Sequence, residues 1–409
     1  MRLLIATLTI SLFISACTQQ KSETLKNTTW RATLTNEAGV ELPFTFEVGN
    51  VGEKQMVVVK NGEEEIVADE LYLNGDSFHL KMPIFDSEIV ATLKNNTLKG
   101  EWLKHYGDTK TVSMPFSAIA DEDYRFSKSP SPANANISGK WDVTFLYDGK
   151  DTTKAIGEFK QEGNKLTGTF LTATGDYRFL EGNVDGAQVS LSCFDGSHAF
   201  IFTAKINDAG ELVDGSFYSG TTYHENWTAV KNENVTLPDA YALTYLKEGY
   251  DKFDFSFPNL KGDTISLADS KFEGKAMIIQ IMGSWCPNCM DETQFLSDFY
   301  EEKPANLEIV ALAYEHSPKF EIAAKSVKRL KARFGVDYPL LIAGTSSKKE
   351  AAETLPMLNH ILSFPTTIFL NQKHEVVKIH TGFSGPGTGE YYEKWLNEFN
   401  KTINEITAS

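Results

Sequence analysis

Residues 283–292 read Gly-Ser-Trp-Cys-Pro-Asn-Cys-Met-Asp-Glu, so that Cys286 and Cys289 are separated by two residues. The preceding run, 275–282, has the composition of a buried strand, whereas residues 294–300 continue with the apolar spacing of a helix. The cysteine pair is therefore predicted to lie at a turn from a strand into a helix. At a helix N-terminus, unpaired backbone amides and the helix dipole stabilise a thiolate.

This placement predicts thiol-disulfide exchange. Cys286, nearest the exposed turn, is expected to attack disulfides, and Cys289, one helical turn further in, is expected to resolve the mixed disulfide. Pro287 suits the start of the helix because of its fixed φ and its missing N–H. Glu292 follows Cys289 by three residues and could take or deliver its proton, although a solvated surface carboxylate is the alternative. No cofactor is expected other than the redox-active disulfide Cys286–Cys289.

Strand and helix signals alternate around this motif, which predicts an α/β domain with a mixed sheet over residues 250–409. The expected elements are a hairpin within 254–267, strands at 307–314 and 338–343, a helix at 321–334, a second hairpin formed by 367–370 and 376–379, and a closing helix at 391–403.

The chain before this domain is rich in short strand signals broken by Gly, Asn and Asp. These signals predict two all-β modules, each an antiparallel sandwich or small barrel, at residues 27–126 and 137–231. Residues 127–136 have the Ser and Pro content of a linker, and residues 232–249 are expected to form a second linker.

The two β modules look like an internal repeat. Trp30 and Trp141 open them, and Leu98-Lys99-Gly100-Glu101-Trp102 parallels Val213-Asp214-Gly215-Ser216-Phe217 in the same order. Neither module carries a recognisable catalytic constellation. Cys193 lies in a strand-like run and is expected to be a packed, inert thiol.

The first residues have the three parts of a secretory signal: the basic Arg2, the apolar run 3–14, and small residues before Cys17. We expect a signal peptide at residues 1–16, because the apolar run is too short to span a bilayer. Residues 14–17, Ile-Ser-Ala-Cys, resemble a bacterial lipobox. That resemblance implies a lipidated Cys17, a tether at 17–26 and a periplasm-facing lipoprotein of the cell envelope, by analogy in the outer membrane. An incidental cysteine after a plain signal peptide is the alternative.

Composition excludes some functions. The formal net charge of the 409 residues is −16, which makes nucleic acid a poor partner. The chain contains four cysteines, and with Cys17 acylated no structural disulfide framework remains. A zinc site would need a second pair of ligands near Cys286 and Cys289, and the sequence contains no other close Cys/His cluster.

Residues from about 250 onward resemble the TlpA/ResA-like branch of thioredoxin-fold oxidoreductases. The resemblance rests on Trp285-Cys286-Pro287-Asn288-Cys289, on Glu292 and on Phe364-Pro365-Thr366-Thr367. It implies that Pro365 is a cis proline beside the disulfide and that Phe364 is its exposed neighbour. It also implies that Trp285, Pro287, Phe364 and Pro365 border the substrate. The sequence departs from the family at Thr293, where proline is frequent.

The same resemblance implies a reductant of disulfides in exported proteins that is itself re-reduced by a membrane thiol reductase. Asn288 agrees with this direction, because it supplies no cation of the kind that favours the reduced form of strong oxidants. Two other classes stay open. A thiol peroxidase would carry Thr where this chain has Gly283, and a binding or assembly lipoprotein would use the β modules to capture a partner.

Overall fold

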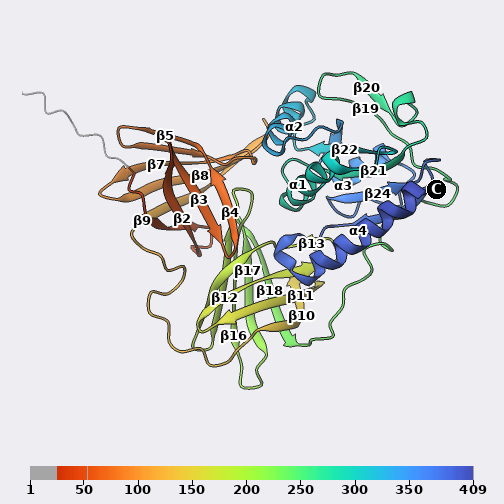
Figure 1. Cartoon of the computed structure of the whole chain (residues 1–409). Helices are drawn as coiled ribbons and strands as arrows, with labels where there is room; N and C mark the ends of the chain where they lie inside the picture. The colour runs from red at the N-terminus through yellow and green to blue at the C-terminus, as the bar shows by residue number, and fades with distance from the viewer. Residues whose placement is uncertain (1–24, 53, 409) are drawn as a thin grey trace, which may run out of the picture.

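Two all-β modules precede an α/β domain in the computed structural model, which describes residues 25–52 and 54–408 (Figure 1). This order confirms the predicted fold class. The predicted signal peptide and Cys17 lie outside the described residues, as does most of the predicted tether. Within the described residues, no helix combines the length and the apolar character needed to cross a lipid bilayer.

The described residues of the first module form one curved antiparallel sheet of nine strands in the order β4-β3-β2-β1-β9-β8-β7-β6-β5. Its strands are β1 (Thr29–Thr35), β2 (Glu41–Val51), β3 (Lys54–Asn61), β4 (Glu64–Ala68), β5 (Glu70–Asn74), β6 (Ser77–Lys81), β7 (Ser87–Lys94), β8 (Thr97–Tyr106) and β9 (Lys110–Ala120). In β7 every second side chain is buried, which is the consequence of alternating apolar residues in a strand with one buried face.

The second module forms a similar antiparallel sheet, which pairing of β11 with β12 closes on itself into a barrel-like shape. Its strands are β10 (Gly139–Tyr147), β11 (Asp151–Glu162), β12 (Lys165–Thr172), β13 (Gly175–Asp176), β14 (Leu180–Asp185), β15 (Gln188–Phe194), β16 (Ala199–Ile206), β17 (Leu212–Ser219) and β18 (Tyr223–Lys231). Aromatic side chains fill its interior: Phe202 stacks on Phe217, and Phe170 packs against both Phe145 and Trp227.

Matching contacts support the repeat that the sequence suggested. Trp30 Nε1 donates to the carbonyl oxygen of Lys26 at 3.0 Å, and Trp141 Nε1 donates to the carbonyl oxygen of Ile137, also four residues earlier, at 2.8 Å. β1 lies between β2 and β9, just as β10 lies between β11 and β18. The two tryptophans therefore anchor the opening strands of the two modules in the same way.

The C-terminal domain is a mixed sheet with helices, in the order β23-β22-β21-β24-β25. β21 is the central strand, parallel to β22 and antiparallel to β24. The elements are β19 (Ser256–Pro258), β20 (Thr264–Ser266), η1 (Ser270–Phe272), β21 (Ala276–Met282), α1 (Pro287–Glu302), β22 (Leu307–Glu315), α2 (Phe320–Phe334), β23 (Leu340–Thr345), α3 (Lys348–Thr354), β24 (Thr366–Leu370), β25 (Val376–Thr381), η2 (Pro386–Thr388) and α4 (Glu390–Ala408).

Three elements of this domain differ most from the prediction. β23 begins at Leu340 rather than at residue 338, because Pro339 has no N–H to contribute to the ladder. α3 was not predicted, since one short helix capped by Ser347 has too few residues to show a helical period. α4 continues to Ala408, with Ile406 buried beyond the predicted end.

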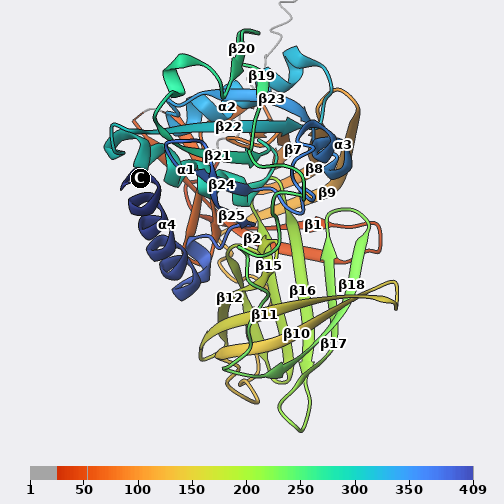
Figure 2. The same ribbon diagram turned by 90° about the vertical axis from the view of Figure 1, so that its right-hand side faces the viewer.

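The second β module lies directly against the C-terminal domain (Figure 2). β13 carries its backbone to the face of the α/β domain where β21 ends and α1 begins, and hydrogen bonds from residues 174–178 cross this boundary. This docking decides the surroundings of the cysteine pair.

Gly100 and Gly215, which the repeat relates, lie where the neighbouring paired strand leaves no room for a side chain. A Cβ atom added to Gly100 would lie 2.0 Å from the Val90 carbonyl oxygen, and one added to Gly215 would lie 2.2 Å from the Trp227 carbonyl oxygen. We expect Gly100→Ala and Gly215→Ala each to lower the free energy of unfolding by about 1–3 kcal/mol in urea titrations. Gly49→Ala is the control, because its Cβ would meet nothing within 4 Å. Equal stability of all three variants would contradict this account.

Candidate active site

The cysteine pair lies where β21 ends and α1 begins. Cys286 is the N-cap residue of α1, and Pro287 occupies its first turn. Cys286 Sγ accepts a hydrogen bond from the backbone N–H of Cys289 at 3.3 Å, and the two sulfur atoms are 2.6 Å apart. A negative charge on the Cys286 sulfur would therefore face both a backbone donor and the positive end of the helix dipole.

The loop before β24 forms one side of the site. The Phe364–Pro365 peptide bond is cis, as the resemblance implies, and Cys286 Sγ lies 3.4 Å from the Phe364 carbonyl oxygen. The expectation that Phe364 is exposed is wrong, because only 6% of this residue is exposed. Its ring packs edge-on against Trp285, with centroids 5.6 Å apart, and against Tyr314.

The two cysteines have different environments. Cys289 is fully buried, and burial, followed by its contact with the Cys286 sulfur, raises the pKa of the Cys289 thiol well above its ordinary value. Cys286 lies at the helix start with 6% of its surface exposed. A protonated Cys289 beneath a more accessible Cys286 is the asymmetry that the predicted order of attack requires.

Glu292 is a buried carboxyl group, so the alternative of a solvated surface residue is wrong. Gln280 Nε2 donates to one carboxyl oxygen at 2.8 Å, and Thr367 Oγ1 donates to the other at 2.6 Å. Burial raises the pKa of Glu292 to about 7, and these two donors limit the rise. The departure at Thr293 fits this environment, since its hydroxyl lies 3.2 Å from Gln280 Nε2.

A second buried carboxyl group lies on the other side of the motif and was missed from the sequence. The backbone N–H and the hydroxyl of Ser284 both donate to Glu315, at 2.7 and 2.6 Å. Burial raises the pKa of Glu315 to about 7. Glu315 ends β22 beside the motif, so a polar residue at the carboxyl end of a buried strand was the available signal.

Trp285 forms the aromatic side of the site. Its indole Nε1 donates to the Tyr314 carbonyl oxygen at 2.9 Å, and its ring stacks on His316 at a centroid distance of 5.0 Å. Burial lowers the pKa of His316 to about 4, so this imidazole is neutral at physiological pH. The Trp285 ring is therefore held in one orientation beside the pair.

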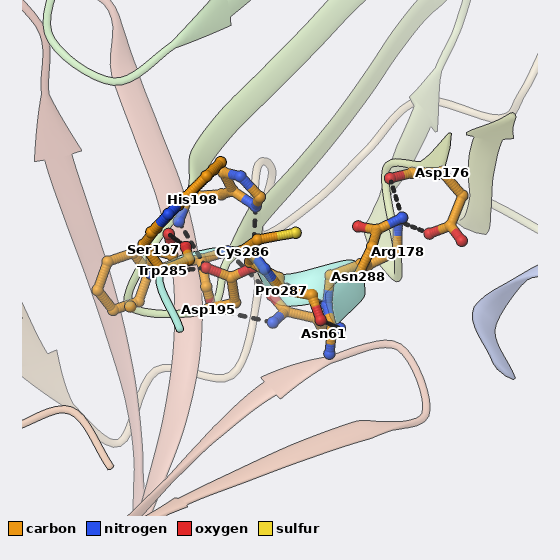
Figure 3. Close-up of polar contacts among 12 residues, drawn as sticks. Asn61, Asp176, Arg178, Asp195, Ser197, His198, Trp285, Cys286, Pro287 and Asn288 are labelled. Carbon is orange, nitrogen blue, oxygen red and sulfur yellow. Dashed lines mark hydrogen bonds and ion pairs between the residues drawn. The ribbon is translucent and has the colours of Figure 1, made fainter. Parts of the chain in front are cut away.

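The second β module contributes residues that the sequence did not indicate. Ser197 Oγ donates to the Trp285 carbonyl oxygen at 3.1 Å, and Arg178 Nη1 donates to the Pro287 carbonyl oxygen at 3.0 Å (Figure 3). Asn288 Nδ2 donates to the Asp176 carbonyl oxygen at 3.2 Å. The expectation that Cys286 occupies an exposed turn is wrong, because only 6% of Cys286 is exposed and this module bonds to the residues on either side of it.

Arg178 is the centre of a buried charge cluster that joins all three modules. Its guanidinium forms ion pairs with Glu64 of the first module and Asp291 of α1, and its Nε lies 3.9 Å from an Asp195 oxygen. Although burial alone would lower it, these carboxylates raise the pKa of Arg178, which keeps its charge. Burial alone would also raise the pKa of Asp195, but His198 and Arg178 lower it to about 2.

A mixed sheet, a cysteine pair at the start of its first long helix and a cis proline beside the pair together define a thioredoxin-fold oxidoreductase. Thiol-disulfide exchange uses the two cysteine sulfurs themselves, and a domain of this class generally needs no separate cofactor.

Comparison with known proteins agrees with this class. The Redoxin family model matches residues 248–394. The thiol-disulfide oxidoreductase ResA of Halalkalibacterium halodurans is 29% identical over 137 residues, which are 33% of this chain and 69% of that protein. The thioredoxin-like protein YneN of Bacillus subtilis is 27% identical over 34% of this chain and 73% of that protein. The alignment with the solved structure of a secreted thiol-disulfide isomerase from Corynebacterium glutamicum covers 42% of this chain and 96% of the isomerase chain, at 20% sequence identity and a TM-score of 0.30.

The C-terminal domain is thus a TlpA/ResA-like thioredoxin-fold oxidoreductase, and its activity is dithiol-disulfide exchange. The family match begins at residue 248, after the last strand of the second β module. The β modules are therefore additions to this domain.

The raised pKa of Glu292 predicts a pH-dependent stability. Between the ordinary value of 4.5 and about 7, the folded chain keeps a proton that the unfolded chain loses, so stability falls as pH rises through this window. Glu292→Gln removes this loss. Between pH 4.5 and pH 8, the unfolding free energy of the wild type should fall by on the order of 3 kcal/mol more than that of the variant. Urea titrations at both pH values measure this, with the exposed Glu321→Gln as control. An equal pH dependence in wild type and Glu292→Gln would refute it.

Proposed function

We propose that this chain reduces disulfide bonds of exported proteins, with Cys286 as the nucleophile and Cys289 as the resolving thiol. The observation that carries the proposal is the position of the Cys286 sulfur. It lies at the N-cap of α1, 3.3 Å from the backbone nitrogen of Cys289 and 3.4 Å from the Phe364 carbonyl oxygen. This position combines stabilisation of a thiolate with a neighbouring backbone that a substrate chain can pair with.

The proposed reaction has two displacements. The Cys286 thiolate attacks one sulfur of the substrate disulfide, a Cys286–substrate disulfide forms, and the other substrate sulfur leaves as a thiolate. The Cys289 thiolate then attacks the Cys286 sulfur, which forms the Cys286–Cys289 disulfide and releases the second substrate thiolate. Two electrons pass from the cysteine pair to the substrate, and the protons of the pair pass to the substrate thiols.

We propose that Glu292 accepts the proton that Cys289 loses. Cys289 must lose its proton before it attacks, and burial opposes that loss. Glu292, three residues further along α1, has a pKa of about 7 and contributes to the raised pKa of Cys289. A carboxyl group with a pKa near the working pH can accept this proton and return it in the reverse direction.

Four residues are proposed to border the substrate: Trp285, Pro287, Phe364 and Pro365. They surround Cys286 on the side of α1 and on the side of the cis-proline loop. The Phe364 carbonyl oxygen lies 3.4 Å from the attacking sulfur, and a substrate strand pairing there would bring its disulfide to Cys286.

The reducing direction is favoured by Asn288, a neutral residue between the cysteines whose amide is engaged by Asp176 and Phe383. Electrons would come from a membrane thiol reductase, in keeping with the resemblance. The reduction potential of the pair decides the direction. A value near −120 mV, about that of the strongest oxidants of this fold, would contradict the proposal.

Replacing each cysteine of the pair by serine should separate the two displacements. Cys286→Ser should abolish dithiol-dependent insulin reduction, and Cys289→Ser should accumulate a mixed disulfide with substrate that non-reducing gels detect. If Glu292 takes the proton of Cys289, Glu292→Gln should accumulate the same species transiently. Cys193→Ser is the matched control, because Cys193 is a fully buried thiol in β15. Insulin reduction by Cys286→Ser at the wild-type rate would remove the assignment.

The proposed location is the periplasmic face of the envelope, with the chain anchored through acyl chains on Cys17. Each buried methylene contributes about 0.8 kcal/mol, so two or more chains hold the protein on a membrane. Cys17→Ser should therefore move the protein from the membrane fraction to the soluble fraction, whereas Cys193→Ser should stay with the membrane. A mass spectrum of the mature N-terminal peptide without acyl chains would exclude this anchor.

A further inference from the structure

We propose that the second β module supplies a wall that selects substrates by size. The access wall consists of Thr174, Asp176, Arg178 and Ser197. It admits small disulfides and disulfides of extended peptide segments to Cys286, and it hinders disulfides held in folded proteins. This inference rests on the proposed reduction of disulfides through Cys286, whose substrate class it narrows.

The access wall holds the motif itself at three successive points. Ser197 bonds to the Trp285 carbonyl oxygen, Arg178 to the Pro287 carbonyl oxygen, and Asn288 to the Asp176 carbonyl oxygen, at 3.0–3.2 Å. Figure 3 shows these side chains converging on the turn that carries Cys286. The wall thus covers the residues on both sides of the reactive sulfur.

The same wall also forms hydrogen bonds with two loops of the C-terminal domain, the cis-proline loop and the loop that contains Gly385. Ser363, directly before the cis-proline bond, donates through its hydroxyl to the Thr174 carbonyl oxygen at 2.6 Å. The backbone N–H of Gly385 donates to Asp176 Oδ2 at 2.7 Å. The fit is close, because a Cβ atom on Gly382 would lie 2.8 Å from the Thr174 carbonyl carbon.

The nucleophile between these contacts is nearly buried, since only 6% of Cys286 is accessible. Attack on a disulfide places the attacking, central and leaving sulfurs nearly in line, so the substrate needs room beyond the first sulfur. A small disulfide or an extended chain brings little bulk beside that line. A folded protein brings its own surface against the access wall.

The charge cluster keeps the wall in place. Arg178 is 11% exposed and is shared among Glu64, Asp195 and Asp291, which come from the first module, the second module and α1. Displacing the wall would separate the buried Arg178 guanidinium from Glu64 and Asp291 and leave these charges without compensation. A bulky substrate must overcome this loss, and a slender one need not.

Two rates of the full-length protein test the wall: reduction of a disulfide joining two short linear peptides, and reduction of insulin as a folded probe. Arg178→Gln and Asp176→Ala each weaken the wall from a different contact. We expect each variant to raise the insulin rate relative to the peptide rate by about tenfold or more. Lys319→Gln is the matched control, because it breaks an ion pair with Asp108 between modules at a place outside the wall. Unchanged ratios in both wall variants would overturn the proposal.

Alkylation of reduced Cys286 gives a readout that needs no redox activity. In wild type, iodoacetamide should react much faster than a maleimide carrying a large polymer, and the wall variants should narrow this difference. Equal accessibility of wild-type Cys286 to both reagents, corrected for their rates with free cysteine, would overturn the wall even if both variants failed to fold. Normal alkylation without reduction of either disulfide probe would instead refute the proposed function alone.

Discussion

The site depends on one sulfur atom placed at the start of a helix. Cys286 caps α1, receives the N–H of Cys289 and lies beside the Phe364 carbonyl. The position follows from β21, the central strand of the sheet, which delivers the chain to the middle of one sheet edge. Its neighbour β24 follows directly on Pro365 and brings the cis-proline loop to the same edge. The geometry of exchange is therefore a property of strand order as much as of the two cysteines.

Burial gives the groups around this sulfur their acid-base character. Glu292 and Glu315 lie on opposite sides of the motif, and burial raises the pKa of each to about 7. Glu292 accepts hydrogen bonds from Gln280 and Thr367, and Glu315 accepts two from Ser284, one from its backbone N–H and one from its hydroxyl. Carboxyl groups with pKa values near neutrality can change protonation at little cost at physiological pH, which suits a reaction that moves protons between buried thiols.

The β modules shape the site rather than merely precede it. Arg178 links both of them to α1 through carboxylates of three modules, and residues 174–178 lie across the motif. Such contacts make the accessibility of Cys286 a property of the whole chain. The internal repeat does not extend to this role. The second module carries the hairpin of β12 and β13 and the loop with Ser197 toward the domain, while the first reaches the cluster through Glu64.

Sequence alone predicted the class of the C-terminal domain, the position of the cysteine pair at the start of a helix and the two all-β modules. Each of these leaves a local signal: two cysteines one helical turn apart, a proline pattern before a strand, or an alternation of period two. Only the tertiary structure decided that Cys286 and Phe364 are covered, that Glu292 is buried, and that Arg178 and Ser197 touch the motif. Arg178 and Pro287 are separated by 109 positions, and Ser197 and Trp285 by 88. Contacts over such separations depend on how the modules dock, and docking leaves no periodic trace in the sequence.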